Sequence, residues 1–580
     1  MNKYAIFHIV EPPYAYGIDD NNLIVRIRTA KNDVSKCELY YKDRYDWKND
    51  YDVKEMKLKE ETELFDFYEA TLYVKEKRYR YLFKITDKDN NALYYNETGF
   101  HSIIENPIEQ GAFQFPFLNS SDVYKGVEWA ENSVVYQIMP DRFCNGDKSN
   151  DPEGVIKWGD KVTRSSMFGG DIQGIIDKLD YLKELGINLI YLTPVFLSST
   201  NHKYNTKDYY KIDDTFGDID KAKELVQKCH ERNIKIIFDA VFNHCGSDFF
   251  AFQDVVKNGK KSKYKDWFFI DEFPVDMDKV NYLTFANNVC IMPKLNTENE
   301  EVKKYLLKVA EYWIKEVNID GWRLDVCDEV DHNFWREFRK TVKKAKKNAI
   351  IVGEIQHEAY SWLKGDQLDS IMNYPFKNLS VDFFAKRKIT AEEFDNELAL
   401  SRAMYMKKIN LLLFNLIDSH DTSRFLYEAS ERVERMFLAI VFQFTYIGIP
   451  YIYYGDEVGI TGGSDPDCRR CMIWDEDRQN KELLNLYKKL IEVRKKEKAL
   501  VYGEYVNLYK KENVLVFKRT FKDEEIVVVL NNSDKFHNIN LEIEKAQYID
   551  LISKENVLID RYIHVKPNEY MILKNVSGRL

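Results

Sequence analysis

The sequence has no apolar run of about 18 residues, the length that a membrane-spanning helix needs. Residues 1–10 also lack the apolar core of about 7–15 residues that marks a secretory signal, and Glu11 and Pro12 follow them directly. The eight cysteines are scattered, and this favours reduced thiols over a disulfide framework. We therefore expect a cytoplasmic protein with no membrane partner.

Basic residues are outnumbered by acidic ones. The chain has 85 Lys and Arg residues against 95 Asp and Glu residues, which gives a formal net charge of −10. A nucleic-acid-binding protein needs a basic surface, so we expect no nucleic-acid partner. Cys468 and Cys471 form a lone C-x-x-C motif with Arg469 and Arg470 between them, and no second pair completes a zinc site. Two structural thiols are the alternative to a metal or redox site there.

Residues 1–125 have the pattern of a β-sandwich. Residues 23–29 begin one strand, and Tyr79, Tyr81, Phe83 and Ile85 alternate with Arg80, Leu82 and Lys84 in another. Short strands without a long helical period predict a sandwich domain. Strand patterns return in residues 502–580, so we predict a second, smaller β-sandwich domain at that end.

Residues 126–501 alternate between short apolar runs and helical patterns. One helical pattern, from Ile172 to Leu185, keeps a single apolar face. Strands alternating with helices predict a (β/α)8 barrel, that is, a TIM barrel. The candidate strands are residues 133–140, 187–195, 234–242, 320–326, 349–355, 369–375, 411–420 and 447–457. Residues 245–298 follow the third strand, have little helical period, and are expected to form an inserted subdomain over the site.

Four segments that carry acids close or follow these apolar runs. They are residues 239–244, 321–326, 352–355 and 418–421. The carboxyl ends of parallel barrel strands form the rim on which active sites are built. The four segments therefore predict that Asp325, Glu354 and Asp421 converge at this rim.

Three acids, an arginine and two histidines at one rim suit glycosidic-bond cleavage. Cleavage with retention needs an ionised carboxylate and a protonated carboxyl group roughly 5–5.5 Å apart. Arg323 lies two residues before Asp325, on the same face of a strand, and its charge favours the ionised carboxylate. Glu354 follows one strand–helix–strand unit later and suits the general acid.

Each of these residues alone has a simpler interpretation. A lone aspartate at a strand end more often caps a helix or forms an ion pair, and a lone His244 more often fills a structural role. Four rim segments in the correct order, each with residues that the same chemistry requires, favour an active site instead. Asp421 and His420 then suit the sugar's ring hydroxyls.

These four segments resemble the conserved regions of the α-amylase superfamily of glycoside hydrolases. The segment Met292–Asn296 resembles an additional signature of the cyclomaltodextrinase, neopullulanase and maltogenic amylase group. The likeness covers nearly the whole chain. Further segments with the same likeness are residues 136–143, 202–206, 448–457 and 465–470.

The resemblance implies a role for each matching residue. Asp325 would be the nucleophile, Glu354 the acid/base and Asp421 the stabiliser of the transition state. The substrate-binding residues that it implies are His244, Arg323, His420, Tyr204, Asp465 and Arg469. The residues that match the group's calcium loop are Asn145, Asp147, Asn150, Asp151, Gly169 and Asp171. Clustered oxygen ligands suit Ca²⁺, which would be structural; an ordinary Asn/Asp-rich turn is the alternative.

Three positions depart from the pattern of the group. Gln356 stands where a tryptophan is usual, Cys327 and Asp328 replace an Ala-Asn pair, and Asn205 replaces an aspartate. The first two departures affect the acceptor side of the site. They leave open the preference among cyclodextrin, pullulan and linear substrates.

The sequence therefore predicts a retaining hydrolase of α-1,4-glucosidic bonds, and possibly of α-1,6 bonds. The expected substrates are cyclomaltodextrins, pullulan and short maltooligosaccharides. The alternatives are an α-glucan transglycosylase and a non-catalytic carbohydrate-binding subunit on the same fold. The resemblance further implies a homodimer.

Overall fold

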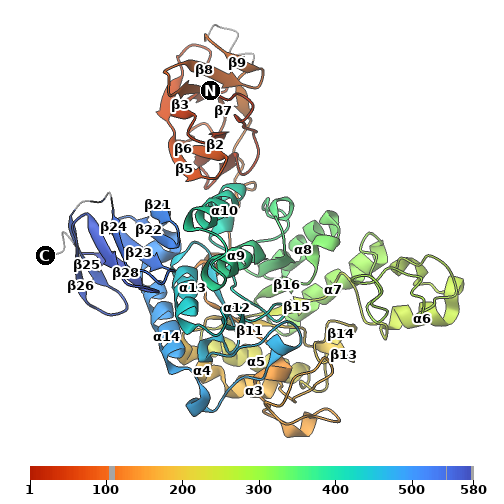
Figure 1. The fold of residues 1–580 in the computed structure, drawn as a ribbon. Coiled ribbons are helices and arrows are strands. Elements are labelled where there is room, and N and C mark those ends of the chain that lie inside the picture. Colours follow the sequence, from red (N-terminus) through yellow and green to blue (C-terminus); the bar gives the residue numbers. More distant parts are fainter. Residues whose placement is uncertain (104–110, 542, 544, 577–580) are drawn as a thin grey trace. The chain divides into compact units, whose positions relative to one another are not determined.

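The computed structural model describes residues 1–103, 111–541, 543 and 545–576. The chain forms two compact units (Figure 1). The first unit comprises Met1–Gly126 and Thr390–Asn410, and the second comprises Val127–Ile389 and Leu411–Leu580.

Two antiparallel sheets form the N-terminal part of the first unit. The sheets have the orders β1-β2-β6-β5 and β4-β3-β7-β8-β9, and β10 pairs with β7. The strands are β1 (Ala15–Gly17), β2 (Asn22–Ala30), β3 (Val34–Asp43), β4 (Asp52–Glu55), β5 (Lys57–Glu61), β6 (Phe65–Tyr73), β7 (Tyr79–Asp87), β8 (Ala92–Asn96), β9 (Gly99–His101) and β10 (Phe113–Phe115). Strands β2 and β7 confirm the two strands predicted in this region.

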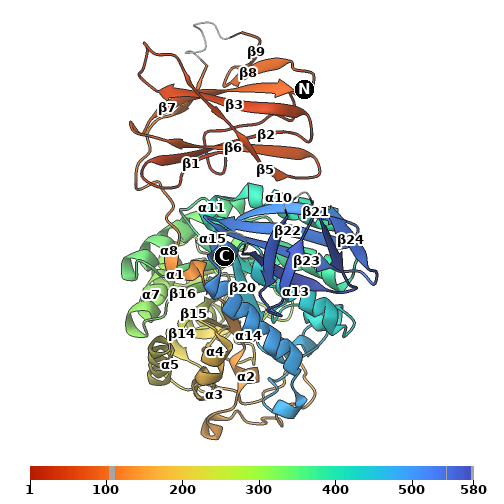
Figure 2. The ribbon, with the colours of Figure 1, turned by 90° about the vertical axis from the view of Figure 1, so that its left-hand side faces the viewer.

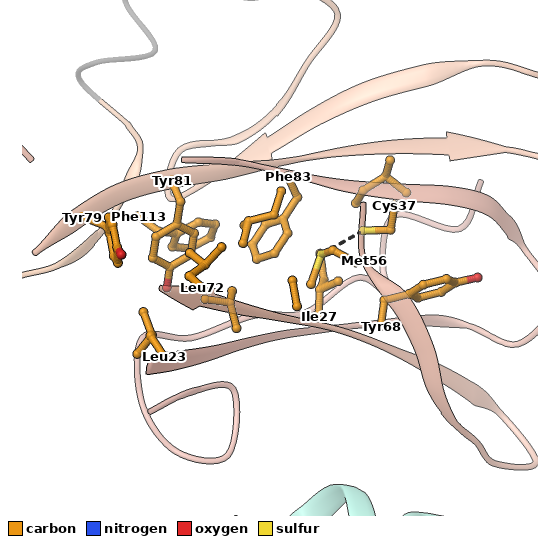
Figure 3. Close-up of a cluster of buried hydrophobic side chains, with 14 of the residues drawn as sticks. Leu23, Ile27, Cys37, Met56, Tyr68, Leu72, Tyr79, Tyr81, Phe83 and Phe113 are labelled. Carbon is orange, nitrogen blue, oxygen red and sulfur yellow. Dashed lines mark hydrogen bonds between the residues drawn. The ribbon is translucent and has the colours of Figure 1, made fainter. Parts of the chain in front are cut away.

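The core of this unit lies between the two sheets (Figure 3). Every second residue of β2 points inward, as Leu23 and Ile27 do, and these side chains meet Tyr81 and Phe83 of β7. All four are fully buried. Because burial of such a side chain stabilises a fold by roughly 1.5–3 kcal/mol, this alternation holds the two sheets together.

Helix α10 (Ala391–Met404) also belongs to the first unit, although it lies between two barrel strands in sequence. A capping box of Thr390 and Glu393 starts the helix. Arg402 of α10 donates to Glu60 at 2.9 Å, and Arg26 of β2 donates to the carbonyl of Ala403 at 2.6 Å. The sequence pattern did not predict that these residues belong with the N-terminal sandwich.

The second unit contains a closed barrel of eight parallel strands (Figures 1 and 2). The strands are β11 (Val135–Ile138), β12 (Leu189–Leu192), β15 (Lys235–Ala240), β16 (Gly321–Leu324), β17 (Ile350–Ile355), β18 (Ser370–Asn373), β19 (Phe414–Asn415) and β20 (Ile449–Tyr453). Each strand lies inside one of the predicted ranges, which confirms the barrel. Nearly continuous apolar runs form these strands because both of their faces are buried.

Helices cover the outside of the barrel (Figure 2). They include α3 (Ile172–Asp177), α4 (Leu179–Leu185), α5 (Ile219–Glu231), α7 (Glu300–Glu316), α8 (His332–Ala345), α9 (Tyr374–Ser380), α12 (Phe425–Glu428), α13 (Val433–Thr445) and α14 (Lys481–Lys496). The single apolar face predicted for residues 172–185 is present, but the helix breaks at Lys178 into α3 and α4. No helix in the described part of the chain is both long enough and apolar enough to cross a membrane.

Two insertions interrupt the barrel pattern. A small sheet of β13 (Phe196–Ser198) and β14 (Thr206–Ile212) follows β12 and was not predicted. The segment 245–298 contains helix α6 (Phe250–Asn258), so the expectation of little helical structure there was incomplete. This helix buries Phe252 and Val255, and the rest of the segment is tied by isolated bridges such as Phe268 to Leu295.

A β-domain follows the barrel. One sheet has the order β21-β22-β23-β28-β25-β26, and β24 pairs with β27. The strands are β21 (Glu504–Lys511), β22 (Val514–Phe521), β23 (Glu524–Asn531), β24 (His537–Asn540), β25 (Ala546–Asp550), β26 (Asn556–Ile559), β27 (Tyr562–Val565) and β28 (Tyr570–Asn575). The predicted C-terminal β-domain is therefore confirmed.

Candidate active site

The predicted acids lie together at the carboxyl ends of the barrel strands. Asp239 lies in β15, Asp325 directly follows β16, Glu354 lies in β17, and Asp421 follows β19. Strands β15, β16 and β17 are neighbours in the barrel. The parallel register therefore places the first three carboxylates side by side at one rim.

One guanidinium group joins these three carboxylates. Nη1 of Arg323 lies 2.9 Å from Oδ1 of Asp325 and 2.9 Å from Oδ2 of Asp239. Nη2 of the same arginine lies 2.8 Å from Oε2 of Glu354. The backbone N–H of Val326 donates to the same glutamate oxygen at 3.1 Å. The Arg323 guanidinium therefore holds Asp325 and Glu354 in place from two neighbouring strands.

Burial and charge act in opposite directions on these acids. Burial raises the pKa of Asp325 well above its ordinary value, the Arg323 guanidinium lowers it, and the neighbouring Glu354 carboxylate raises it further. Burial likewise raises the pKa of Asp239 to about 6, again opposed by Arg323. Because one guanidinium faces several carboxylates, it offsets burial only in part, and the charge of Asp239 also raises the pKa of Asp325. Retaining hydrolysis needs one proton and one negative charge at such a pair.

Two neutral histidines flank the acids. Burial lowers the pKa of His244 to about 3 and that of His420 well below its ordinary value. Nε2 of His244 has no hydrogen-bond partner and lies 4.0 Å from Oδ2 of Asp325, which also has none. These two free polar atoms suit a ligand that can satisfy both, such as a sugar hydroxyl.

The other wall of the site is built around Asp421. Gln137 donates to Nδ1 of His420, so Nε2 carries the hydrogen and lies 3.0 Å from Oδ2 of Asp421. Nη2 of Arg469 lies 3.2 Å from Oδ1 of Asp421, and Nη1 of the same arginine lies 3.0 Å from Asp465. Burial raises the pKa of Asp421, and the Arg469 guanidinium lowers it.

Tyr204 links the two walls. Its hydroxyl donates to Asp239 at 3.1 Å, and its ring is parallel to that of His420 with the centroids 5.6 Å apart. Tyr191 also donates to Asp239, at 2.6 Å. Asp239 therefore orients Arg323 and Tyr204 from beneath the site.

These groups surround a cleft of about 650 Å³. Its lining residues are Arg164, His202, Tyr204, His244, Phe285, Val289, Met292, Asp325, Val326, Asp328, Glu329, Glu354, Gln356, Asp421, Asp465 and Arg469. The predicted site residues Arg323 and His420 are absent from this lining. Both are 1% exposed and contact the carboxylates Asp325, Glu354 and Asp421 from behind.

The sequence did not identify every residue of the cleft. Phe285 and Val289 come from the insertion 245–298, and Phe285 stacks on His244 with the ring centroids 4.8 Å apart. Arg164 comes from an irregular loop, where no period or motif marks it. The sequence placed this insertion over the site, but it did not mark Phe285 or Val289 individually.

The residues that depart from the group's pattern lie in different parts of the site. Gln356 and Asp328 line the cleft, and Asp328 lies 3.0 Å from Nε2 of His357. Cys327 is buried, and its thiol donates to the carbonyl of Glu354 at 3.4 Å. Asn205 is buried and accepts a hydrogen bond from Ser198 at 2.6 Å. Of these departing residues, Gln356 and Asp328 therefore line the cleft, while Cys327 and Asn205 are buried behind it.

The predicted calcium-binding residues are connected to one another. Asn145 donates to Asp151 at 2.6 Å, and the Asn150 side chain hydrogen-bonds to Asp171. Asp171 also accepts from the backbone N–H of Asp147 at 2.8 Å. Gly169 has a positive φ of 77°, and a Cβ at this residue would lie 2.3 Å from Asp151 Oδ1, so only glycine fits.

Two amide oxygens in this loop have no partner. Oδ1 of Asn145 and Oδ1 of Asn150 are both buried without a hydrogen bond. Within the described ranges no group of three or more His, Cys, Asp or Glu side chains could hold a metal. The predicted ligands of this loop are all oxygen donors, without a histidine or cysteine. Such a donor set fits Ca²⁺ and does not fit a transition metal.

The C-x-x-C motif has a structural setting. Cys468 and Cys471 are both buried and free, and the Cys468 thiol donates to the carbonyl of His420 at 3.4 Å. Burial raises the pKa of both thiols to about 12. A neutral, buried thiol is unreactive, so these contacts favour the structural interpretation.

Comparison with known proteins yields three family models along the chain. The model described as alpha amylase, catalytic domain, matches residues 137–503. The N-terminal ig-like domain model matches residues 1–119, and the C-terminal domain model matches residues 503–571.

Individual relatives match over nearly the full length. The chain is 56% identical to a cyclomaltodextrinase of Thermoanaerobacter pseudethanolicus, covering 99% of this chain and 100% of the relative. It is 46% identical to neopullulanase 2 of Thermoactinomyces vulgaris, covering 95% of each chain. A solved cyclomaltodextrinase structure superposes with a TM-score of 0.95 at 41% identity, covering 99% of this chain and 100% of that one.

Proposed function

Because the chain belongs to the α-amylase family and is a hydrolase of its cyclomaltodextrinase and neopullulanase group, we propose that it opens cyclomaltodextrins and cleaves short maltooligosaccharides and pullulan. The bonds cleaved are α-1,4-glucosidic, with α-1,6 bonds as a second class. The observation that carries this proposal is the placement of Asp325 and Glu354 on one Arg323 guanidinium beside the cleft.

The reaction proceeds with retention in two steps. Asp325 attacks the anomeric carbon and forms a glycosyl ester, while Glu354 gives its proton to the departing glycosidic oxygen. Glu354 then accepts a proton from water, whose oxygen attacks the same carbon and releases Asp325. Arg323 binds both carboxylates throughout, so it limits the change in their positions as charge passes between them.

The remaining site residues act on the sugar. Asp421 stabilises the oxocarbenium-like transition state, and His244 donates to a ring hydroxyl. Tyr204 supports the sugar at the cleavage point, and Asp465 with Arg469 binds the next glucose on the non-reducing side. Arg323 and His420 hold the acids from behind.

The loop around Asp151 and Asp171 is proposed to bind Ca²⁺ as a structural ion. The ligands would be Asn145, Asp147, Asn150, Asp151, Gly169 and Asp171. Bound calcium would fix the loop and satisfy the free amide oxygens of Asn145 and Asn150. The ion takes no part in the chemistry of the cleft.

Cytoplasmic location is also part of the proposal. All eight cysteines are free, as expected in a reducing compartment. Substrates in that compartment would be small imported rings and oligosaccharides. Fractionation of the source cells with an antibody against the chain tests this part separately.

The direct test compares rates on β-cyclodextrin, pullulan, soluble starch and maltotriose. We expect the highest kcat/KM on β-cyclodextrin, with linear maltooligosaccharides shortening to maltose and glucose. Products longer than the starting oligosaccharide, dominant even at low substrate, would instead support a transglycosylase. Binding without product release would support a non-catalytic subunit, which the presence of all three carboxylates disfavours.

A further inference from the structure

Residues 418–425, here called the Asp421 loop, carry His420 and Asp421, and hydrogen bonds close this loop at both ends. The backbone N–H of Phe425, the first residue of α12, donates to Oδ2 of Asp418 at 2.7 Å. Inside the segment, the N–H of Ser419 donates to Thr422 at 3.0 Å. Asp418 is therefore the anchor on which the geometry of the Asp421 loop depends.

Asp456 forms the opposing anchor, in the short helix that follows β20 (Asp456–Val458). Arg424, at the end of the loop, donates through Nη1 to Oδ1 of Asp456 at 2.8 Å and to the carbonyl of Tyr454 at 2.7 Å. Its Nε donates to the carbonyl of Cys468 at 2.9 Å. The loop is thus pinned to the chain beyond β20 through one fully buried guanidinium.

Each of the two anchoring acids has one oxygen that no N–H or hydroxyl group reaches. Oδ1 of Asp418 and Oδ2 of Asp456 are buried without a donor, and both residues are 1% exposed. The two carboxyl groups hydrogen-bond to each other. A hydrogen bond between two carboxyl groups requires a proton on one of them, and two bare charges here would face one arginine.

We propose that Asp418 and Asp456 share a single proton, and that this carboxylic acid–carboxylate hydrogen bond makes them positioning residues for His420 and Asp421. The shared proton satisfies both orphaned oxygens at once. It leaves one negative charge on the pair, which Arg424 neutralises. The consequence for catalysis rests on the proposed role of Asp421.

Burial favours a proton on the pair, and the neighbouring cations oppose it. Burial and the neighbouring Asp418 carboxylate raise the pKa of Asp456 well above its ordinary value, while Arg424 lowers it. Burial raises the pKa of Asp418, and Arg424 and Lys377 lower it. Other titratable groups that interact with the pair include Tyr451 and Tyr487, both buried. The Arg424 guanidinium lies over the rings of Tyr453 and Tyr454, and Glu457 directly follows Asp456.

The pH dependence of stability follows from the raised pKa of these acids. An acid whose folded pKa is raised stabilises the fold fully at low pH, and that stability is lost as pH rises through the folded pKa. Loss of the shared proton would place two charges side by side beneath the Asp421 loop. The pair would therefore set an alkaline limit on both stability and turnover.

The test uses Asp418→Asn and Asp456→Asn. In either variant the amide donates permanently to the remaining carboxylate while its oxygen keeps the Phe425 or Arg424 contact. We expect kcat on β-cyclodextrin to stay within about threefold of the parent at neutral pH. The alkaline fall in kcat and in the unfolding temperature, measured from about pH 5 to about pH 10, should become shallower in both variants.

Two control variants separate the effect of lost structure from the effect of the shared proton. Asp418→Ala removes the anchor without supplying a donor and should lower kcat at least about tenfold with little change in KM, since the loop loses its closure. Tyr487→Phe removes the nearby hydroxyl, which also lacks a partner, and should leave the alkaline limb unchanged.

The proposal is overturned if kcat and the unfolding temperature fall equally steeply at alkaline pH in the parent and in both asparagine variants. It is also overturned if the alkaline fall changes only in Tyr487→Phe. The unfolding measurements do not depend on activity. A parent that cleaves no α-glucan would therefore contradict the proposed function, while the shared proton would still be tested by the unfolding temperatures.

Discussion

At the residue scale, Arg323 determines how charge is distributed over the catalytic acids. Its guanidinium contacts Asp239, Asp325 and Glu354 and is only 1% exposed. Burial of these carboxylates favours their protonated forms, and a cation beside them opposes this effect. The arginine therefore lowers the pKa of Asp325, which burial raises.

Replacement of either catalytic acid should nearly abolish turnover. Asp325→Asn and Glu354→Gln should each lower kcat on β-cyclodextrin by about 10⁴-fold, because groups that act as a unit fail together. Only Glu354→Gln should keep substantial activity on α-maltosyl fluoride, whose leaving group needs no proton. Asp328→Asn is the matched control in the same cleft and should stay within about tenfold. Near-parental rates of Asp325→Asn on β-cyclodextrin would remove the nucleophile assignment.

Arg469 should govern the acid limb of the pH profile. Its guanidinium lowers the pKa of Asp421, which burial raises. The proposed stabiliser must be ionised, so activity is lost as pH falls through the pKa of Asp421. Arg469→Gln removes the cation, raises that pKa and should move the acid limb of kcat/KM to higher pH by about one unit. A limb that stays in place, measured on β-cyclodextrin, would show that another group sets it.

At the scale of single elements, buried aspartates join the barrel strands to the outer helices. Asp369, just before β18, accepts from the backbone N–H of Ile351 in β17 at 3.0 Å. It also lies 2.8 Å from Arg339 and 2.6 Å from Lys343, both of α8. Asp320 has a similar arrangement before β16, with His230 of α5 at 2.7 Å. These carboxylates fix helices against the barrel away from the catalytic cleft.

Asp369→Asn should therefore destabilise the fold without a direct effect on the chemistry. Breaking a buried ion pair costs about 3–5 kcal/mol, and here two cations lose their partner. Arg339 and Lys343 lower the pKa of Asp369, so this stability is present at neutral pH and is lost as pH falls through the folded pKa. Urea unfolding of the variant at neutral pH should show the loss, which should shrink in acid. An unchanged midpoint would contradict it.

The calcium loop is tested at the same scale. Chelation should lower the unfolding temperature of the parent by several degrees, and added Ca²⁺ should restore it, because bound ligand stabilises the folded state. Asp151→Ala should lose this response, because it removes one of the proposed ligands. No effect of chelator on the parent would mean that the loop is an ordinary Asn/Asp-rich turn.

Sequence patterns predicted the elements whose signal is local. Each barrel strand is a short apolar run in the sequence, and the acids at the strand ends predicted the rim at which these acids lie together. The break at Lys178 was invisible because the apolar period continues through it. Arg164 and Phe285 were missed because loop residues reach the cleft through tertiary folding. The placement of Arg323 and His420 behind the acids also needed side-chain geometry.

At the scale of the whole molecule, the N-terminal sandwich exposes several large aromatic and aliphatic side chains. Tyr4 is 99% exposed, Trp47 62% and Tyr73 67%. Trp47 also lies over the Arg80 guanidinium, 4.0 Å from the ring centre, so its position is fixed. Fixed, exposed rings of this kind are frequent in protein interfaces.

We therefore expect a homodimer in solution. Light scattering during size exclusion at micromolar concentration should give twice the chain mass of 68.9 kDa. Trp47→Ala should shift this equilibrium toward monomer, and Tyr562→Ala, an exposed tyrosine of the C-terminal domain, is the matched control. A parent that elutes only as monomer would contradict the homodimer that the resemblance implies.

The membership of helix α10 in the sandwich unit limits how this gene can be divided. A cut after Gly126 would remove Glu60, which accepts from Arg402, and Arg26, which donates to the Ala403 carbonyl. Helix α10 itself would stay within the remaining polypeptide. Deletion of the first domain therefore exposes a newly unpaired surface on the catalytic fragment. Recombination that transplants this sandwich to another hydrolase succeeds only if the internal helix travels with it.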